Sequence, residues 1–273
     1  MSETVAEAPA APKLPLALFG RDGLLRRLDG TDDVIVAGPR QIIGIDPGLS
    51  AHVGFARATL VAHAPESVVR EFINTTPPDE YHTFSDRHPV RLTAWLDSTA
   101  DLPIMSVRYD DPAAGDFTHL VQGVHQLVAT WPPMGRSHTT VIIEKQYNIP
   151  GRANSVGQRL MQVELAIHSA LWHLWGVTAD PVAPKSVKAF YAKTAFAGLK
   201  GHSEYKGAAV RWLAGKLGCG AQRTYSDHIA DAAMFIDMYI QRRFAQIPEH
   251  WKRDYPDRTR WIDGPPPDAL VIR

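Results

Sequence analysis

The strongest constraint on the fold is a short apolar run that ends in one acid and a sharp turn. Residues 42–45, Ile-Ile-Gly-Ile, are followed by Asp46 and then by Pro47 and Gly48. An apolar run bounded by a Pro-Gly turn is typical of a buried strand. A second apolar run follows at 52–61, close enough to pair with the first as a hairpin. We therefore expect strands over 40–46 and 52–61, with Asp46 at the end of the first.

The remaining pattern alternates strands with helices. Further strands are expected over 67–75 and 138–145, a short strand followed by a loop over 177–184, and a short helix over 90–99. A helix with one buried stripe is expected over 114–131, and a long helix over 155–175 is apolar on more than one face. The last expected helices cover 184–193, 204–217 and 226–243. This order predicts an α/β protein with a mixed sheet covered on both sides.

The flanking segments lack such periodicity. We expect a partly disordered N-terminal extension over 1–39, one main domain over 40–244 with an insertion near 76–113, and an irregular C-terminal tail over 245–273. Long aperiodic stretches of this kind usually lie on the surface of a domain.

Composition places the chain among ordinary globular proteins, with 45% hydrophobic and 21% charged residues. No apolar run approaches the roughly 20 residues that span a bilayer, so we expect no membrane association. The first residues lack a basic region followed by an apolar one, so no secretory signal is expected. Because Cys219 is the single cysteine, no internal disulfide is possible, which favours a reducing compartment.

Acidic side chains stand where chemistry could use them. Asp46 and Glu144 end two expected strands, and the last helix opens with Asp227, His228 and Asp231. Spacings of three and four residues put His228 and Asp227 on the same helix face as Asp231. Oxygen-rich clusters of this kind suit Mg²⁺, and two ions about 4 Å apart support attack on a phosphodiester. The sequence therefore points to a magnesium-dependent phosphodiester hydrolase.

Charge is distributed unevenly although the net charge is zero. Residues 185–223 contain eight Lys and Arg and only one acid, Glu204. Basic residues gathered in this way can neutralise nucleic-acid phosphates, although a solvated helix face is the simpler reading of the segment alone.

Three motifs together resemble a known family. The stretches 42–58, 141–146 and 226–236 resemble the first hairpin, the glutamate-bearing central strand and the last helix of RuvC-type Holliday-junction resolvases. Residues 143–176 are also similar to mitochondrial and poxvirus cruciform-cutting resolvases. The resemblance implies an RNase H-like mixed five-stranded sheet flanked by helices on both faces. It also implies a homodimer that cuts four-way junctions with two symmetric nicks.

Carried over from the family, Asp46, Glu144 and Asp231 would be catalytic and would bind two Mg²⁺ ions, which Mn²⁺ can replace. The fourth position stays open between His228, at the bacterial spacing, and Asp227, at the mitochondrial spacing. We favour His228 in the catalytic set, with Asp227 as a further metal ligand. Branched DNA would be contacted by basic residues and one tyrosine of the middle of the chain: Lys145, Tyr147, Arg152, Arg159, Lys185, Lys188, Lys193, Lys200 and Lys206.

Two other functions remain open. The chain could be another RNase H-like nuclease, such as an RNase H or a transposase-type enzyme, or a junction-binding protein without activity. An exonuclease is disfavoured because Pro47 and Gly48 stand where those enzymes carry a second acid on the first strand. The expected location is cytoplasmic or nucleoid-associated, in a bacterial or viral setting, and a mitochondrial one stays open.

Overall fold

The structure is a computed structural model of the whole chain. It describes residues 17–19, 25–27, 33–47, 52–84, 90–103, 124–126, 128–129, 139–146, 155–218, 225–244 and 259–263. Within these ranges, no helix is both long and apolar enough to cross a membrane.

Five strands form the centre of a mixed sheet, in the order β5-β4-β3-β6-β7. The first three are antiparallel neighbours, and β6 and β7 continue the sheet in parallel. This is the mixed five-stranded arrangement of an RNase H-like fold, so the predicted fold class is confirmed. The strands are β3 (Asp33–Pro47), β4 (His52–Pro65), β5 (Arg91–Pro103), β6 (Thr139–Glu144) and β7 (Ala179–Val182).

Three more strands extend this sheet to eight. The short strand β2 (Leu25–Arg27) pairs with the beginning of β3, and β1 (Ala17–Phe19) pairs with β2. Strand β8 (Thr259–Asp263) pairs in parallel with β5. The boundary predicted at residue 40 therefore falls inside β3. The tail predicted to be irregular contains a strand, which is held where Trp261 Nε1 donates a hydrogen bond to buried Asp237 at 2.8 Å.

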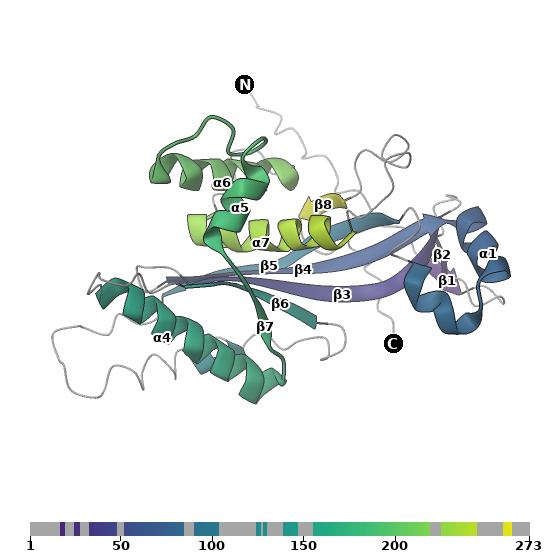
Figure 1. Cartoon of the computed structure of the whole chain (residues 1–273), viewed down its shortest axis with the longest axis horizontal. Helices are drawn as coiled ribbons and strands as arrows, with labels where there is room; N and C mark the ends of the chain where they lie inside the picture. The colour runs from purple at the N-terminus through teal and green to yellow at the C-terminus, as the bar shows by residue number, and fades with distance from the viewer. Residues whose placement is uncertain are drawn as a thin grey trace, which may run out of the picture.

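Helices cover both faces of the sheet (Figure 1). One face carries α5 (Pro184–Tyr191), α6 (His202–Lys216) and α7 (Asp227–Phe244), and the other carries α4 (Ser155–Ala170) with its π-helical continuation η3 (Leu171–Trp175). Alternation along β3 explains the division, because Ile42 packs on the α7 side and Ile43 and Ile45 pack on the α4 side. Residues 124–126 and 128–129 are helical, and buried Val124 and Val128 also face the α4 side.

Two predicted elements are wrong. Residues 67–75, expected as a strand, lie in helix α1 (Glu66–Thr75), which is followed by the 3₁₀ helix η1 (Pro78–Thr83). The buried side chains of α1, Val69 and Phe72, are three residues apart, which is a helical spacing. Residues 90–99, expected as a helix, belong almost wholly to β5, which pairs with β4 from Arg91 to Pro103. Part of the predicted insertion over 76–113 is therefore a central strand.

Candidate active site

Strand geometry brings Asp46 and Glu144 to one edge of the sheet. The parallel strands β3 and β6 pair as far as Ile45 and Ile143, and each acid follows directly after one of these residues. Asp46 shares its side of β3 with Ile42, and Glu144 shares its side of β6 with Ile142. Both acids therefore face helix α7.

Helix α7 supplies the third acid. Ser226 precedes the first residue of this helix, and its Oγ accepts a hydrogen bond from the backbone N–H of Ile229 at 3.2 Å. The helix lies very close to the sheet because Gly44 and Gly54 have no side chains. A Cβ on Gly44 would lie 2.1 Å from the carbonyl oxygen of Ala232. This close packing sets His228 and Asp231 beside the strand ends.

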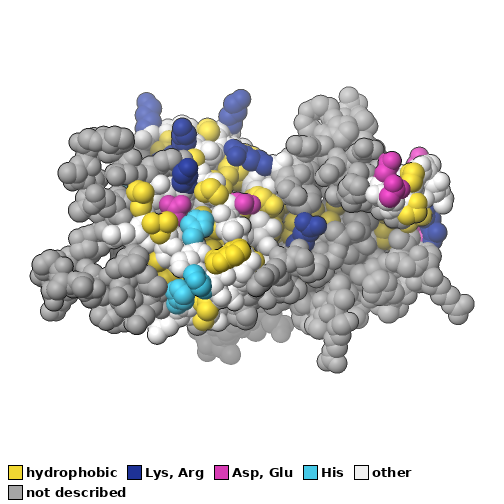
Figure 2. All heavy atoms as spheres, turned by 60° about the horizontal axis from the view of Figure 1, so that its bottom comes forward, with side chains coloured by type: hydrophobic (Ala, Val, Ile, Leu, Met, Phe, Trp, Pro, Cys, Tyr) yellow, Lys and Arg dark blue, Asp and Glu magenta, His cyan; other side chains and the backbone are white. Residues whose placement is uncertain are grey.

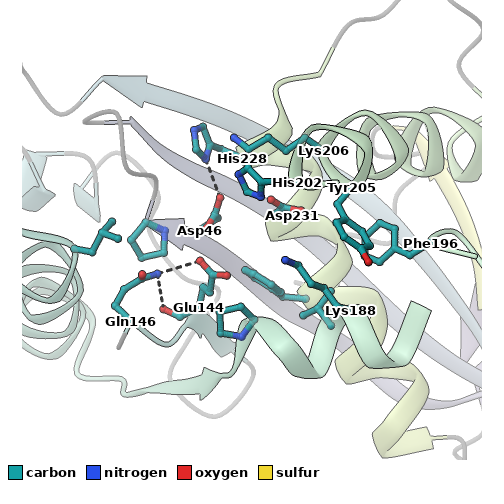
Figure 3. A pocket seen from close by; sticks show the side chains of 15 residues that line it. Asp46, Glu144, Gln146, Lys188, Phe196, His202, Tyr205, Lys206, His228 and Asp231 are labelled. Carbon is teal, nitrogen blue, oxygen red and sulfur yellow. Dashed lines mark hydrogen bonds and ion pairs between the residues drawn. The ribbon is translucent and has the colours of Figure 1, made fainter. Parts of the chain in front are cut away.

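The three predicted carboxylates line one pocket of about 280 Å³. Figure 3 shows Asp46, Glu144 and Asp231 together in the pocket, with His228 on one side. The fold thus brings together three acids that are far apart in the sequence. Asp227 does not line the pocket.

Crowding of these acids changes their protonation. Burial, together with the charge of Asp46 and a hydrogen bond to it, raises the pKa of Glu144 to about 9. Burial and the charges of Asp46 and Asp227 raise the pKa of Asp231 to about 7. Each acid resists ionisation first because it is buried and second because a neighbouring carboxylate carries a like charge. A bound cation would favour the ionised form of both acids and would therefore lower both pKa values.

His228 and Asp227, adjacent in sequence, have different partners. His228 Nδ1 lies 2.9 Å from Oδ2 of Asp46, and this hydrogen bond raises the pKa of the imidazole despite burial. Asp227 instead accepts a hydrogen bond from Nζ of Lys206. Burial raises the pKa of Asp227, but the contact with Lys206 and the charge of His228 outweigh it and leave the pKa lowered. His228 therefore belongs to the carboxylate cluster, and Asp227 links α7 to α6.

The donor set matches a hard divalent cation, because it consists of carboxylate oxygens that repel one another without one. Among the described residues, however, no group of three or more His, Cys, Asp or Glu side chains already has the arrangement of a metal site. Two of the three carboxylates have hydrogen-bond partners among the side chains. The Asp46 carboxylate accepts from His228, and Glu144 Oε2 accepts from Gln146 Nε2 at 3.0 Å.

The predicted DNA-binding residues differ in their exposure and in whether they line the pocket. Lys145, Lys185, Lys188, Lys193 and Lys200 are exposed, and Figure 2 shows Lys and Arg side chains on the same face as acids and histidines. Lys188 and Lys206 line the pocket itself. Tyr147 and Arg152 lie outside the described residues, as does the side chain of Arg159.

Sequence reasoning missed Gln146. Its side chain contacts Glu144, and its backbone N–H donates to Oε2 of Glu164 on α4 at 3.0 Å. Gln146 therefore ties a candidate catalytic acid to the helix on the opposite face of the sheet. Its position two residues after Glu144 was the available signal, because alternate residues of an extended chain point the same way. The aromatic residues that line the pocket, Phe196, Tyr205 and Phe235, were not predicted from the sequence either.

No protein-family model and no curated protein matches this chain. The solved structures that are similar to it include two of RuvC. One is T. thermophilus RuvC in complex with Holliday junction substrate, with 18% identity and a TM-score of 0.44, and the other is a Thermus thermophilus RuvC structure, with 17% and 0.43. Each similarity covers 76% of this chain and 97% of the other. Neither is high enough to assign an activity.

Proposed function

We propose that this protein is a Mg²⁺-dependent endonuclease that resolves four-way DNA junctions, as a homodimer that makes two symmetric nicks. The observation that carries the proposal is the meeting of Asp46, Glu144 and Asp231 in one pocket. The choice of a four-way junction rests on the resemblance of the three sequence motifs to resolvases.

Each residue of the pocket has its own proposed role. Asp46, Glu144 and Asp231 would hold the ions, and bound Mg²⁺ would activate a water and stabilise the leaving oxyanion. His228 orients Asp46 through their hydrogen bond and can hold a proton at Nδ1. Lys206 pairs with Asp227 and also lines the pocket, where its ammonium group could contact a phosphate.

Charge around the pocket supports a polyanionic substrate. Lys188 and Lys206 line the pocket, and Lys185, Lys193 and Lys200 are exposed on the same part of the chain. Basic side chains around an acidic centre attract a phosphate backbone and leave the acids to bind cations. This pattern favours a nuclease over a binding protein, because crowded buried acids are costly unless a function uses them.

The dimer has a candidate surface on α4 and η3. Leu165 is 62% exposed and Trp172 is 60% exposed, and their seven-residue spacing puts them on one helix face. The opposite side of the helix packs in the core through Val163 and Ile167. The helix is apolar on more than one face, and only one of these faces is buried within a single chain. A second copy related by a twofold axis could cover the rest.

Cleavage of labelled DNA tests the proposal. The full-length protein should cut a synthetic four-way junction in Mg²⁺, leave a linear duplex of the same sequence intact, and lose activity in EDTA. Asp46→Asn should reduce the rate by about a thousandfold, because charge stabilisation by the ions is worth several kcal/mol.

The other outcomes separate the alternatives. Faster cutting of an RNA–DNA hybrid than of the junction would favour an RNase H-type enzyme. Tight junction binding without any cutting, in Mg²⁺ or Mn²⁺, would favour a protein that binds junctions and does not cleave them.

A further inference from the structure

The pocket has a second half that phosphodiester hydrolysis does not need. Beyond the carboxylates it is lined by Val187, Phe196, Tyr205 and Phe235. Figure 3 shows Tyr205 and Phe196 at one end of the pocket and Asp46 and Glu144 toward the other. A phosphate with its cations would occupy only the polar half. The apolar half would suit an apolar, flat group attached to that phosphate.

The aromatic wall is held rigidly. Tyr205 Oη donates a hydrogen bond to the carbonyl oxygen of Leu199 at 2.9 Å. Phe196 meets the Tyr205 ring edge to face, with centroids 5.1 Å apart. Buried Phe196 also contacts Tyr191, with centroids 5.9 Å apart. The Tyr205 ring is therefore fixed on two sides before any ligand arrives, which lowers the entropy cost of stacking on it.

The end of a long, flexible side chain lies over the Tyr205 ring. Lys188 Nζ lies 4.9 Å from the ring centroid, and Lys188 is exposed at the pocket. An exposed cation–π contact is weaker than the stacking of a nucleobase on an aromatic ring. A base could therefore replace the ammonium group over the ring. The displaced ammonium group would remain beside the phosphate that joins the base to the chain.

We infer that this aromatic half of the pocket binds one unpaired nucleobase, adjacent to the phosphate that is cut. The inference rests on the proposed nuclease function and adds a selective element to it. At a branch point, bases can leave the stack at low cost, whereas a base in continuous duplex must first be unpaired. A pocket that requires such a base next to the carboxylates would select branched over linear DNA. His202, exposed at the rim, and Lys206 add hydrogen-bond donors for the nucleotide.

Abasic sites test the inference directly. Junctions carrying a single abasic nucleotide, moved one position at a time across the nick site, are cut under single-turnover conditions. We expect one position at which the missing base slows the wild-type protein about tenfold. Tyr205→Leu should slow cutting of the intact junction by a similar factor and should lose nothing further at that abasic position. Tyr205→Phe keeps the ring and should retain the wild-type ratio of the two rates.

Phe190→Leu is the matched control, because Phe190 is an aromatic residue of α5 that does not line the pocket. It should leave both the rate and the abasic ratio unchanged. The inference is overturned if no abasic position slows the wild type, or if the effects of Tyr205→Leu and the abasic site multiply.

Binding separates this inference from the proposed function. The Asp46→Asn variant is titrated with intact and abasic junctions, and anisotropy gives the two affinities. If the wild type cuts nothing while binding depends on the base and on Tyr205, the base pocket stands and the nuclease proposal fails. If the wild type cuts junctions with no dependence on the base, the reverse holds.

Discussion

His228 and Asp227 show how neighbouring residues can take different roles. Sequence spacing alone allowed either to be the fourth catalytic residue, because both lie within one turn of Asp231. The structure pairs His228 with Asp46 and pairs Asp227 with Lys206. This difference depends on how closely α6 packs against α7. The three- and four-residue spacings along the sequence of α7 carry no information about that packing.

Substitution should separate the two residues. His228→Ala should lower the junction-cleavage rate by about 100-fold, since it removes a proton-holding group in contact with Asp46. Asp227→Asn should lower it by less than about tenfold, because Asp227 does not line the pocket and its carboxylate is paired with Lys206. Single-turnover rates give both values. Equal losses, or a larger loss in Asp227→Asn, would show that this division of roles is wrong.

Gln146 should act as a positioning residue for Glu144. Without the hydrogen bond from Gln146 Nε2, the Glu144 carboxylate loses its orientation. Gln146→Ala should weaken Mg²⁺ binding by about 10- to 100-fold, and added Mg²⁺ should restore most of the rate. Gln126→Ala, at an exposed helical position, is the control. A loss of rate that no Mg²⁺ concentration restores would contradict a positioning role.

At the level of elements, the strands and the helix that carry the three acids were predicted from the sequence, whereas β5 and β8 were not. The strands that end at Asp46 and Glu144 and the helix that begins after Ser226 were all predictable. Strand β5 was not recognised, because Leu92, Ala94 and Leu96 are buried along with Thr93 and Trp95 between them. A strand without a polar face has no alternation to read. Strand β8 depends on a distant partner, β5, which a local pattern does not contain.

The contact between α7 and β4 should be sensitive to one methyl group. Gly54 pairs with Asp46 across the hairpin, and a Cβ there would lie 2.3 Å from the carbonyl carbon of His228. Gly54→Ala should push the start of α7 outward. We expect the free energy of unfolding to fall by about 1–3 kcal/mol and cleavage to be lost.

Gly215→Ala in α6 is the matched control for this substitution. A Cβ on Gly215 would have no atom within 4 Å, so the variant should be as stable as the wild type or more so, as expected for Ala in a helix. Chemical denaturation measures both variants. If Gly54→Ala is as stable and active as the wild type, the close packing of α7 does not position the site.

For the whole molecule, the central question of assembly is what covers the exposed apolar face of α4 and η3. Leu165→Glu combined with Trp172→Glu should convert the proposed dimer to a monomer, as measured by sedimentation equilibrium. Ile73→Glu changes an exposed apolar residue of α1 and should leave the dimer intact. On a plasmid cruciform, the monomer should give single nicks, whereas the dimer gives linear product. A double variant that stays dimeric would place the interface elsewhere.

The most direct test of the whole account is a calorimetric titration of metal-free protein with Mg²⁺ at pH 8, in buffers of different ionisation enthalpy. Because the pKa of Glu144 is raised to about 9, this acid is mostly protonated at pH 8 and must release its proton to bind a cation. We predict saturable binding with release of about one proton per site, tighter as pH rises toward 9. Glu144→Gln should bind more weakly and release no proton. The account is contradicted if the wild type shows no saturable binding, or if Glu144→Gln binds Mg²⁺ as the wild type does.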